Sequence, residues 1–290
     1  MQAQKLVIPA FFLAYACAAQ VAIDRKPADP PLIPDTASLE SNIPYDQHKE
    51  TVLDILQPKA PAAGKRPGLI MIHGGGWVGG TKEQRVPSTL RYVEKGFVVA
   101  NVRYRLAGTA PAPAAVSDVL KAADWFRKNA RKYNVDPNRV AVTGDSAGGH
   151  LALMVGLTPK SARLGPQAKV RAVVNFYGIT DVADQLSGPN MRQYAVKWVP
   201  EQAGRMELAQ RVSPITYVRK DVPSILTIHG DADPTVPYEH GVTLTRLLRE
   251  AGADAEMISV RDGKHGFTQE ELDKLFVQIF DFLTKRGVVK

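Results

Sequence analysis

A serine in the pattern G-x-S-x-G is the residue whose type and spacing most directly predict chemistry. The segment 144–148, GDSAG, follows a run typical of a buried strand and precedes a run typical of a helix. In that context the serine is held on a tight turn with its hydroxyl exposed, and the two glycines avoid clashes across the bend. The following helix presents its positive end to the serine, which favours a developing anion. We therefore predict that Ser146 is a nucleophile.

A glycine-rich loop, HGGGW at 73–77, follows an earlier strand-like run and predicts donors for an oxyanion. Consecutive glycines leave backbone N–H groups unobstructed, so that these groups can point at a carbonyl oxygen as it becomes negative. Gly75 and Gly76 are the expected donors, and the N–H of Ala147 is expected to be a third. His73 is expected to hold the loop, and Trp77 to line the site or its base.

A serine hydroxyl needs a base within hydrogen-bond reach before it becomes a good nucleophile. Of the histidines, His265 follows the last strand-like run and precedes the last helix, which is the position that the order serine, acid, histidine requires. His150 falls one helical turn after Ser146 and is expected to pack in the core. His229 ends a strand-like run and is expected to be structural.

The acid that orients the histidine is expected in the segment 229–237, HGDADPTVP. Asp233 is preferred because it lies further out on the loop, whereas Asp231 is nearer the strand and is expected to bond backbone groups of the turn. Asp262, shortly before His265, is a weaker alternative. The predicted catalytic residues are therefore Ser146, Asp233 and His265.

Short apolar runs alternate with amphipathic helical patterns from residue 50 onward. The runs are rich in valine and isoleucine and hardly alternate with polar residues, which is the pattern of parallel strands covered on both faces. The expected strands are 69–73, 97–104, 139–144, 170–178, 223–230 and 255–260, with 50–56 as an antiparallel edge strand. The alternation predicts an α/β fold with a mostly parallel, doubly wound sheet of about eight strands and helices on both faces. Ligands of such sheets bind at the C-terminal ends of the strands, where the motifs above fall.

The connection from about residue 180 to residue 212 is longer than most and is predicted to form a small cover over the site. Within it, Met191, Tyr194 and Trp198 recur at spacings of three and four, so that they would share one face of a short helix. Two interpretations stay open: this face lines the substrate pocket, or it packs on the main body of the fold. The candidate pocket residues are accordingly Trp77, Met191, Tyr194 and Trp198.

The first 19 residues resemble a secretory signal peptide. A positive charge precedes an apolar stretch, Leu6–Ala19, that is too short to span a bilayer comfortably, and small residues near its end suit signal peptidase. This pattern predicts a secreted or periplasmic protein with no integral membrane association after cleavage. A buried N-terminal helix and a lipid-modified Cys17 are the alternatives. Residues 20–45 are rich in proline and are expected to form an arm, so that the folded domain would span 46–290.

The composition of the 290 residues is that of a globular protein, with 44% hydrophobic and 23% charged residues. That balance excludes a disordered chain or a coiled coil, and a mean hydropathy of −0.17 excludes a multi-span membrane protein. The formal net charge is +8, but the basic residues are scattered, so no nucleic-acid partner is expected.

Four motifs resemble those of the hormone-sensitive-lipase-like branch of the α/β-hydrolases: HGGGW, NVRYRL (101–106), GDSAGGHLAL and the late HGF. The segment SPITYV before PSILTIHGDADPTVP is similar to bacterial carboxylesterases that are grouped with feruloyl and acetyl-xylan esterases. The resemblance covers roughly residues 45–286 and implies the α/β-hydrolase fold. It also implies acyl transfer to water through an acyl-serine, with no metal or other cofactor. The long N-terminal cap helices of hormone-sensitive-lipase relatives are not evident in the proline-rich arm, which favours the smaller secreted esterases.

The leading prediction is a serine carboxylesterase for short- to medium-chain esters, whose substrate is a small molecule or an acetyl or feruloyl ester on a polysaccharide. Two alternatives stay open. An arylformamidase-like amidase shares the HGG-x-W loop and the G-x-S-x-G-x-H turn, although the signal-like N-terminus argues against a cytosolic pathway. A hydrolase-fold binding protein would keep the fold without catalysis, but such proteins usually lack one of the three catalytic residues.

Overall fold

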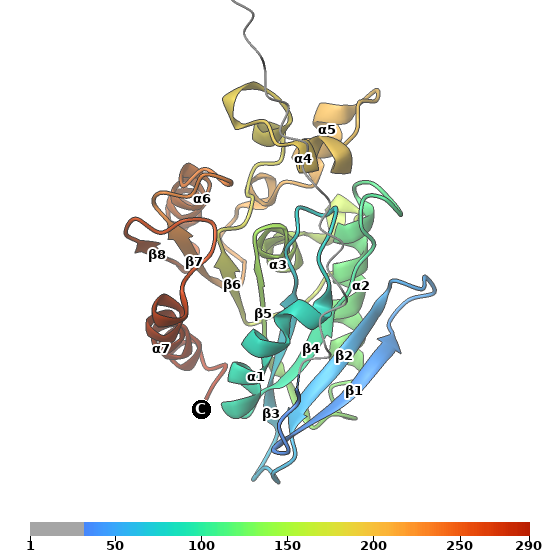
Figure 1. Cartoon of the computed structure of the whole chain (residues 1–290), viewed down its shortest axis with the longest axis vertical. Coiled ribbons are helices and arrows are strands. Elements are labelled where there is room, and N and C mark those ends of the chain that lie inside the picture. The colour runs from blue at the N-terminus through green and yellow to red at the C-terminus, as the bar shows by residue number, and fades with distance from the viewer. Residues whose placement is uncertain (1–31) are drawn as a thin grey trace, which may run out of the picture. The chain divides into compact units, whose positions relative to one another are not determined.

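The computed structural model describes residues 32–290, and an eight-stranded sheet runs through them (Figure 1). Its spatial order is β1-β2-β4-β3-β5-β6-β7-β8, in which β2 pairs antiparallel with both β1 and β4 and the other neighbours are parallel. The predicted α/β fold with a mostly parallel sheet is therefore confirmed. The strands are β1 (Ala37–Pro44), β2 (Val52–Pro58), β3 (Arg66–Ile72), β4 (Val98–Val102), β5 (Val135–Asp145), β6 (Ala172–Phe176), β7 (Ser224–Gly230) and β8 (Ala255–Val260).

The central strands are buried on both faces, because successive side chains of a strand point to opposite sides of the sheet. In β3, Leu69 and Met71 join one hydrophobic cluster, whereas Ile70 and Ile72 join the other. All four side chains are at most 4% exposed. A strand of this kind has no polar face, which explains the continuous apolar runs in the sequence.

Helices cover both faces of the sheet. The cluster on one face includes side chains of α2 (Ala114–Lys128), α3 (Ala147–Leu157) and α6 (Glu239–Glu250), and the cluster on the other face includes α1 (Val86–Glu94) and α7 (Gln269–Lys285). The helix α3 is apolar on every side, and ten of its eleven residues are buried. A helix of that composition is stable only inside the fold, so α3 is a rigid support for the residue that precedes it.

The folded part begins before residue 46, which corrects the boundary expected from the sequence. Residues 37–44 form β1, which pairs with β2 and takes the edge position that was expected for 50–56. The strand β2 is antiparallel, as expected, but its outer edge is paired with β1, so that β2 is not the edge strand. The strand β1 escaped prediction because most of its side chains are exposed and they show no apolar alternation.

The predicted signal peptide at 1–19, Cys17 and the first part of the proline-rich arm lie outside the described residues. Among residues 32–290, no helix combines the length and the apolar character that crossing a bilayer requires.

The segment expected to form a cover lies between β6 and β7. Figure 1 shows its helices α4 and α5 beyond the C-terminal ends of the strands, which is the side on which parallel sheets bind ligands. The elements of this connection are η3 (Ala183–Leu186), η4 (Gly188–Asn190), α4 (Gln193–Trp198), α5 (Arg205–Arg211) and η5 (Pro214–Tyr217). Two further short helices, η1 (Lys82–Arg85) and η2 (Lys160–Ala162), lie earlier in the chain.

Candidate active site

Ser146 lies on the turn between β5 and α3, and its backbone has φ 54° and ψ −121°. A positive φ is strained for a residue with a Cβ, and such strain is concentrated at functional sites. The Ser146 N–H donates a hydrogen bond of 2.9 Å to the Phe176 carbonyl, which fixes the turn against β6. The two flanking glycines are sterically required, because a Cβ on Gly144 would collide with the Gly148 carbonyl. The turn therefore holds the serine in the way that the motif predicts.

Ser146, His265 and Asp233 form a continuous chain of polar contacts at the C-terminal ends of the strands. Nε2 of His265 is 2.9 Å from Oγ of Ser146, and Nδ1 of His265 is 2.7 Å from Oδ2 of Asp233. The imidazole is 19% exposed, whereas the carboxylate is fully buried. A histidine held between a buried carboxylate and a serine hydroxyl is arranged to accept the hydroxyl proton.

The carboxylate of Asp233 is held in its ionised form by the groups around it. Its Oδ1 accepts hydrogen bonds from the N–H groups of Thr235 (2.7 Å) and Val236 (3.0 Å). Nε2 of His229 lies 3.3 Å from its Oδ2. Burial alone would raise the pKa of the Asp233 carboxyl, but the hydrogen bonds from His229 and His265 hold that pKa well below its ordinary value. The negative charge that a protonated imidazole needs is therefore present.

The two other candidate acids lie apart from the imidazole of His265. Oδ1 of Asp231 accepts a hydrogen bond of 2.7 Å from the N–H of Asp262, which is the kind of turn contact expected for Asp231. The side chain of Asp262 is 91% exposed and lies beside Arg261. Of the three carboxylates, Asp233 is the one that contacts the ring of His265.

Tyr177 supports the histidine from the side of β6, and sequence reasoning did not select it. Its ring centre is 4.7 Å from that of His265 and 5.3 Å from that of Phe267. Its backbone has φ 37°, and its N–H donates to the Ile228 carbonyl (2.7 Å). A bulky residue in the left-handed region is strained, and here the hydrogen bond to β7 holds it.

The glycine loop presents free backbone donors to the serine. Gly75 and Gly76 line the same cavity as Ser146, with φ of 114° and 58°. A Cβ on Gly76 would lie 2.8 Å from the side chain of Tyr194, so a larger residue does not fit there. Among the hydrogen bonds of residues 32–290, none uses the N–H of Gly75, Gly76 or Ala147. These three groups are thus available for an oxyanion.

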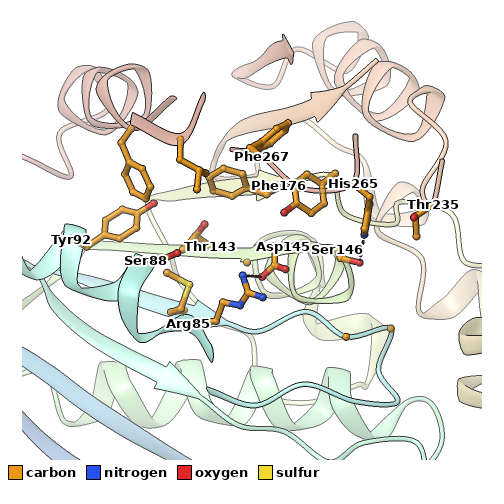
Figure 2. A pocket seen from close by; sticks show the side chains of 18 of the residues that line it. Arg85, Ser88, Tyr92, Thr143, Asp145, Ser146, Phe176, Thr235, His265 and Phe267 are labelled. Carbon is orange, nitrogen blue, oxygen red and sulfur yellow. Dashed lines mark hydrogen bonds and ion pairs between the residues drawn. The ribbon is translucent and has the colours of Figure 1, made fainter. Parts of the chain in front are cut away.

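A cavity of about 550 Å³ opens beside Ser146, which is a usual size for a small-molecule site. Figure 2 shows it running from His265 and Ser146 past Asp145 to Tyr92. One wall is aromatic and the opposite wall, from η1 and α1, carries polar groups. The aromatic wall consists of Phe176, Tyr177, Phe267 and Phe276, and the opposite wall carries Arg85 and Ser88. The ring of Tyr92 packs edge-on against that of Phe276, at a centroid distance of 5.4 Å. In the part of the chain that the structure describes, no three His, Cys, Asp or Glu side chains are grouped to bind a metal ion.

Three of the four candidate pocket residues do not line this cavity. Trp77 and Trp198 are fully buried, and their rings stack at a centroid distance of 4.1 Å, so they join α4 to the main body. Met191 is 43% exposed on the surface. Tyr194, one turn before Trp198, does line the cavity. A spacing of four aligns two side chains along a helix but does not determine what each contacts, and here one faces the cavity and the other the core.

The other histidines of the motifs are structural, as expected. Nδ1 of His150 accepts from the indole N–H of Trp77 (3.1 Å), and Nε2 of His150 lies 2.7 Å from the Val212 carbonyl oxygen. The ring of His73 stacks on Tyr104 at 4.3 Å. Burial lowers the pKa of His150 and that of His73 to about 4, so both are neutral at pH 7.

Two charged residues of the cavity were not selected from the sequence. Asp145 immediately precedes the serine, and Arg85 ends η1, with its Nη1 at 3.2 Å from Oδ1 of Asp145. Burial raises the pKa of the Asp145 carboxyl, and the charge of Arg85 opposes that shift. Asp145 is the variable position inside the G-x-S-x-G pattern, which could have drawn attention to it. No spacing rule connects Arg85 with a partner so far along the chain.

Comparison with known proteins adds independent evidence. The protein-family model BD-FAE matches residues 53–248. Esterase LipQ of Mycobacterium tuberculosis is 32% identical over 231 residues, which are 75% of this chain and 54% of LipQ. Ethyl acetate hydrolase of Pseudomonas putida is 28% identical over 270 residues, which are 86% of this chain and 83% of that protein. The chain therefore spans little more than half the length of LipQ but most of the second relative.

A solved structure shows the same similarity in three dimensions. It is a truncated form of a carbohydrate esterase from gut microbiota, with a TM-score of 0.76 and 31% sequence identity. The match covers 89% of this chain and 99% of that one. The similarity in sequence and the similarity in fold are thus both to proteins named as ester hydrolases.

Proposed function

Because the chain belongs to the BD-FAE family, we propose that it is a serine carboxylesterase acting through an acyl-serine intermediate. The observation that carries this proposal is the continuous chain Ser146–His265–Asp233 beside a cavity that Gly75 and Gly76 line. The relatives support it, since they are named as an esterase and as an ethyl acetate hydrolase.

The first half-reaction forms the acyl-serine. Oγ of Ser146 attacks the ester carbonyl carbon while Nε2 of His265 takes the hydroxyl proton, and the carbonyl oxygen becomes an oxyanion beside the N–H groups of Gly75, Gly76 and Ala147. The C–O bond to the alcohol then breaks, and His265 gives its proton to the leaving alkoxide. Losing one oxyanion donor typically costs about 3–4 kcal/mol of transition-state stabilisation.

The second half-reaction releases the acid. Water attacks the acyl-serine and gives a proton to His265, and the bond between the acyl carbon and Oγ of Ser146 breaks. The serine regains its proton from His265, and a carboxylic acid leaves. Throughout both halves, Asp233 keeps the imidazole in one orientation and stabilises its protonated form.

The proposed substrates are short- to medium-chain carboxylic esters, including acetyl or feruloyl groups on polysaccharides. Support comes from the carbohydrate-esterase structure, 99% of which is covered by the match with this chain. The cavity is also large enough for more than an acetyl group. A secreted or periplasmic location is proposed with them, because the pattern of residues 1–19 is that of a signal peptide and a polysaccharide substrate lies outside the cytoplasm.

The test is hydrolysis of p-nitrophenyl esters from acetate to decanoate by the wild type and by Ser146→Ala. We expect the alanine variant to lose at least about 10⁴-fold in kcat, since the nucleophile and its base act as a unit. Ser38→Ala, the same change on the edge strand β1, is the matched control and should keep full activity. Activity that survives in Ser146→Ala would overturn the proposal. Faster hydrolysis of an N-formyl aromatic amide than of any ester would assign the site to an amidase.

A further inference from the structure

Arg85 places a guanidinium in the substrate cavity without a hydrogen bond to the rest of the protein. Its one ionic contact is Nη1 to Oδ1 of Asp145 at 3.2 Å, and the side chain of Arg85 donates no hydrogen bond within residues 32–290. Its Nε is buried and has no acceptor among those residues. A guanidinium carries five N–H donors in a fixed plane, and donors without acceptors in a partly desolvated site cost free energy.

A second arginine–aspartate pair shows how this fold holds an arginine in a bidentate ion pair. Nε of Arg105 donates to Oδ2 of Asp118 at 2.9 Å, and Nη2 donates to Oδ1 at 2.6 Å. The Arg105 N–H adds a third bond to the same carboxylate, at 3.0 Å. Such a bidentate pair engages both oxygens of the carboxylate and two of the three guanidinium nitrogens. The pair in the cavity leaves the donors of its arginine available instead.

The position of Arg85 relates these donors to one part of the substrate. Figure 2 shows Ser146 with His265 on one side and with Asp145 and Arg85 on the other. The leaving alcohol takes its proton from His265, so it must lie against that ring. The acyl group then extends the other way, past Arg85 and toward Tyr92.

The acyl part of the cavity has two unlike walls. Phe176 and Phe276 form an apolar surface on one side, and the Arg85 side chain, 30% exposed, faces it from η1. An acyl group bound there has one face packed on aromatic rings and another face next to N–H donors. That arrangement suits a mainly apolar chain that carries an oxygen atom.

We propose that Arg85 determines acyl specificity by donating a hydrogen bond to an oxygen acceptor partway along the acyl group. The inference rests on the proposed serine-esterase function and adds the class of acyl group: chains with an ether, hydroxyl or keto oxygen are preferred over hydrocarbon chains of equal length. A neutral oxygen fits better than a carboxylate, because Asp145 already balances the charge of Arg85 and would repel a second anion. A site that hydrogen-bonds its substrate rejects the analogue lacking that group.

The test uses pairs of p-nitrophenyl esters that differ by one atom. Methoxyacetate is compared with butanoate, 3-methoxypropanoate with pentanoate, and 4-methoxybutanoate with hexanoate, so that the ether oxygen moves along the chain. The ratio of kcat/KM within each pair is measured for the wild type and for Arg85→Met. Dividing the two ratios cancels the inductive effect of the oxygen on the ester, which is the same for both enzymes.

We expect the ratio for at least one pair to fall about ten-fold in Arg85→Met, the size of one hydrogen bond to a charged donor. Arg85→Lys keeps a positive charge next to Asp145 but loses the planar fork, so it should restore activity on hydrocarbon esters without restoring the full preference. This variant also carries the test if Arg85→Met does not fold. Arg246→Met, which removes a surface arginine paired with one carboxylate, is the matched control and should leave every ratio unchanged.

Ratios that stay within two-fold of the wild type for all pairs would overturn the inference and reduce Arg85 to a support for Asp145. A preference seen only when the oxygen is placed in the alcohol would overturn it as well. Neither result affects the proposed esterase function, which fails on a separate outcome, namely ester hydrolysis that persists in Ser146→Ala.

Discussion

The histidine–aspartate pairs His265–Asp233 and His240–Asp184 differ in what the second ring nitrogen of the histidine contacts. Nδ1 of His265 is 2.7 Å from Asp233, and Nε2 of His240 is 3.0 Å from Asp184. The remaining nitrogen of His265 faces the hydroxyl of Ser146, whereas that of His240 accepts the backbone N–H of Thr180 at 3.0 Å. An imidazole next to a carboxylate is therefore a base for catalysis only where its other nitrogen is left for a reacting hydroxyl.

The two carboxylates differ as well. Asp233 is fully buried and accepts two backbone N–H groups, whereas Asp184 is 37% exposed and accepts the side-chain amide of Asn190 at 3.0 Å. Since Asp184 lies in η3 and His240 in α6, the second pair ties the cover segment to the main body. One pair is arranged to move a proton, and the other to hold two elements together.

The largest difference in kcat is expected when the aspartate of each pair is replaced by asparagine. Asp233→Asn should lower kcat by about 10³–10⁴-fold, because an amide can hold the imidazole in the wrong tautomer and cannot balance its charge. Asp184→Asn should change kcat by no more than a few-fold. Steady-state hydrolysis of one p-nitrophenyl ester by both variants checks this, and equal losses would remove the distinction between the pairs.

A smaller effect is expected on stability at low pH, because the buried histidines bind protons less readily in the folded state than in the unfolded state. Burial lowers the pKa of His240, and lowers that of His150 to about 4. Below about pH 6.5 the unfolded chain binds protons that the folded chain does not, so the free energy of unfolding falls with falling pH. For His150 the difference between pH 7 and pH 4 amounts to about 3 kcal/mol.

Urea unfolding at several pH values measures this loss. His150→Gln and His240→Gln should each be less dependent on pH than the wild type, even where they are less stable at pH 7. The stability gap between the wild type and His150→Gln should narrow by about 3 kcal/mol from pH 7 to pH 4. A gap that is constant with pH would show that burial does not control the protonation of His150.

The smallest effect is expected from Asp231→Asn, on the same loop as Asp233. Asp231 contacts the N–H of Asp262 and not the imidazole, and an asparagine oxygen can accept the same bond. We expect a change below about 1 kcal/mol in the free energy of unfolding and nearly unchanged kcat. A loss as large as that of Asp233→Asn would reassign the acid within this loop.

The reactive centre could be located from the sequence because its constraints are local. The G-x-S-x-G turn needs small residues at fixed positions around Ser146, and the steric reason for them is visible at Gly144. His265 and Asp233 follow from chain order, since Asp233 lies on the loop after β7 and His265 on the loop after β8. The parallel sheet then brings these distant loops to one edge.

The substrate cavity could not be located in that way, because its walls come from side chains without a sequence period. Arg85 and Asp145 meet through the pairing of β3 with β5, which no local pattern encodes. Trp77 and Trp198 have the size and spacing of pocket residues, yet their stacked rings fill the core. The edge strand β1 also gave no signal, because exposed polar side chains on a strand resemble those of a loop.

The cover segment enters and leaves the fold at neighbouring strands. It follows β6 and returns at β7, and these two strands are paired in register from Ala172 to Phe176. Insertions at such a point leave the order and register of the sheet untouched, so the segment is an exchangeable module. A segment grafted from a related enzyme would need an aromatic residue that stacks on Trp77, as Trp198 does. It would also need a carboxylate that pairs with His240, as Asp184 does. The substrate range could then be changed independently of the residues that break the ester bond.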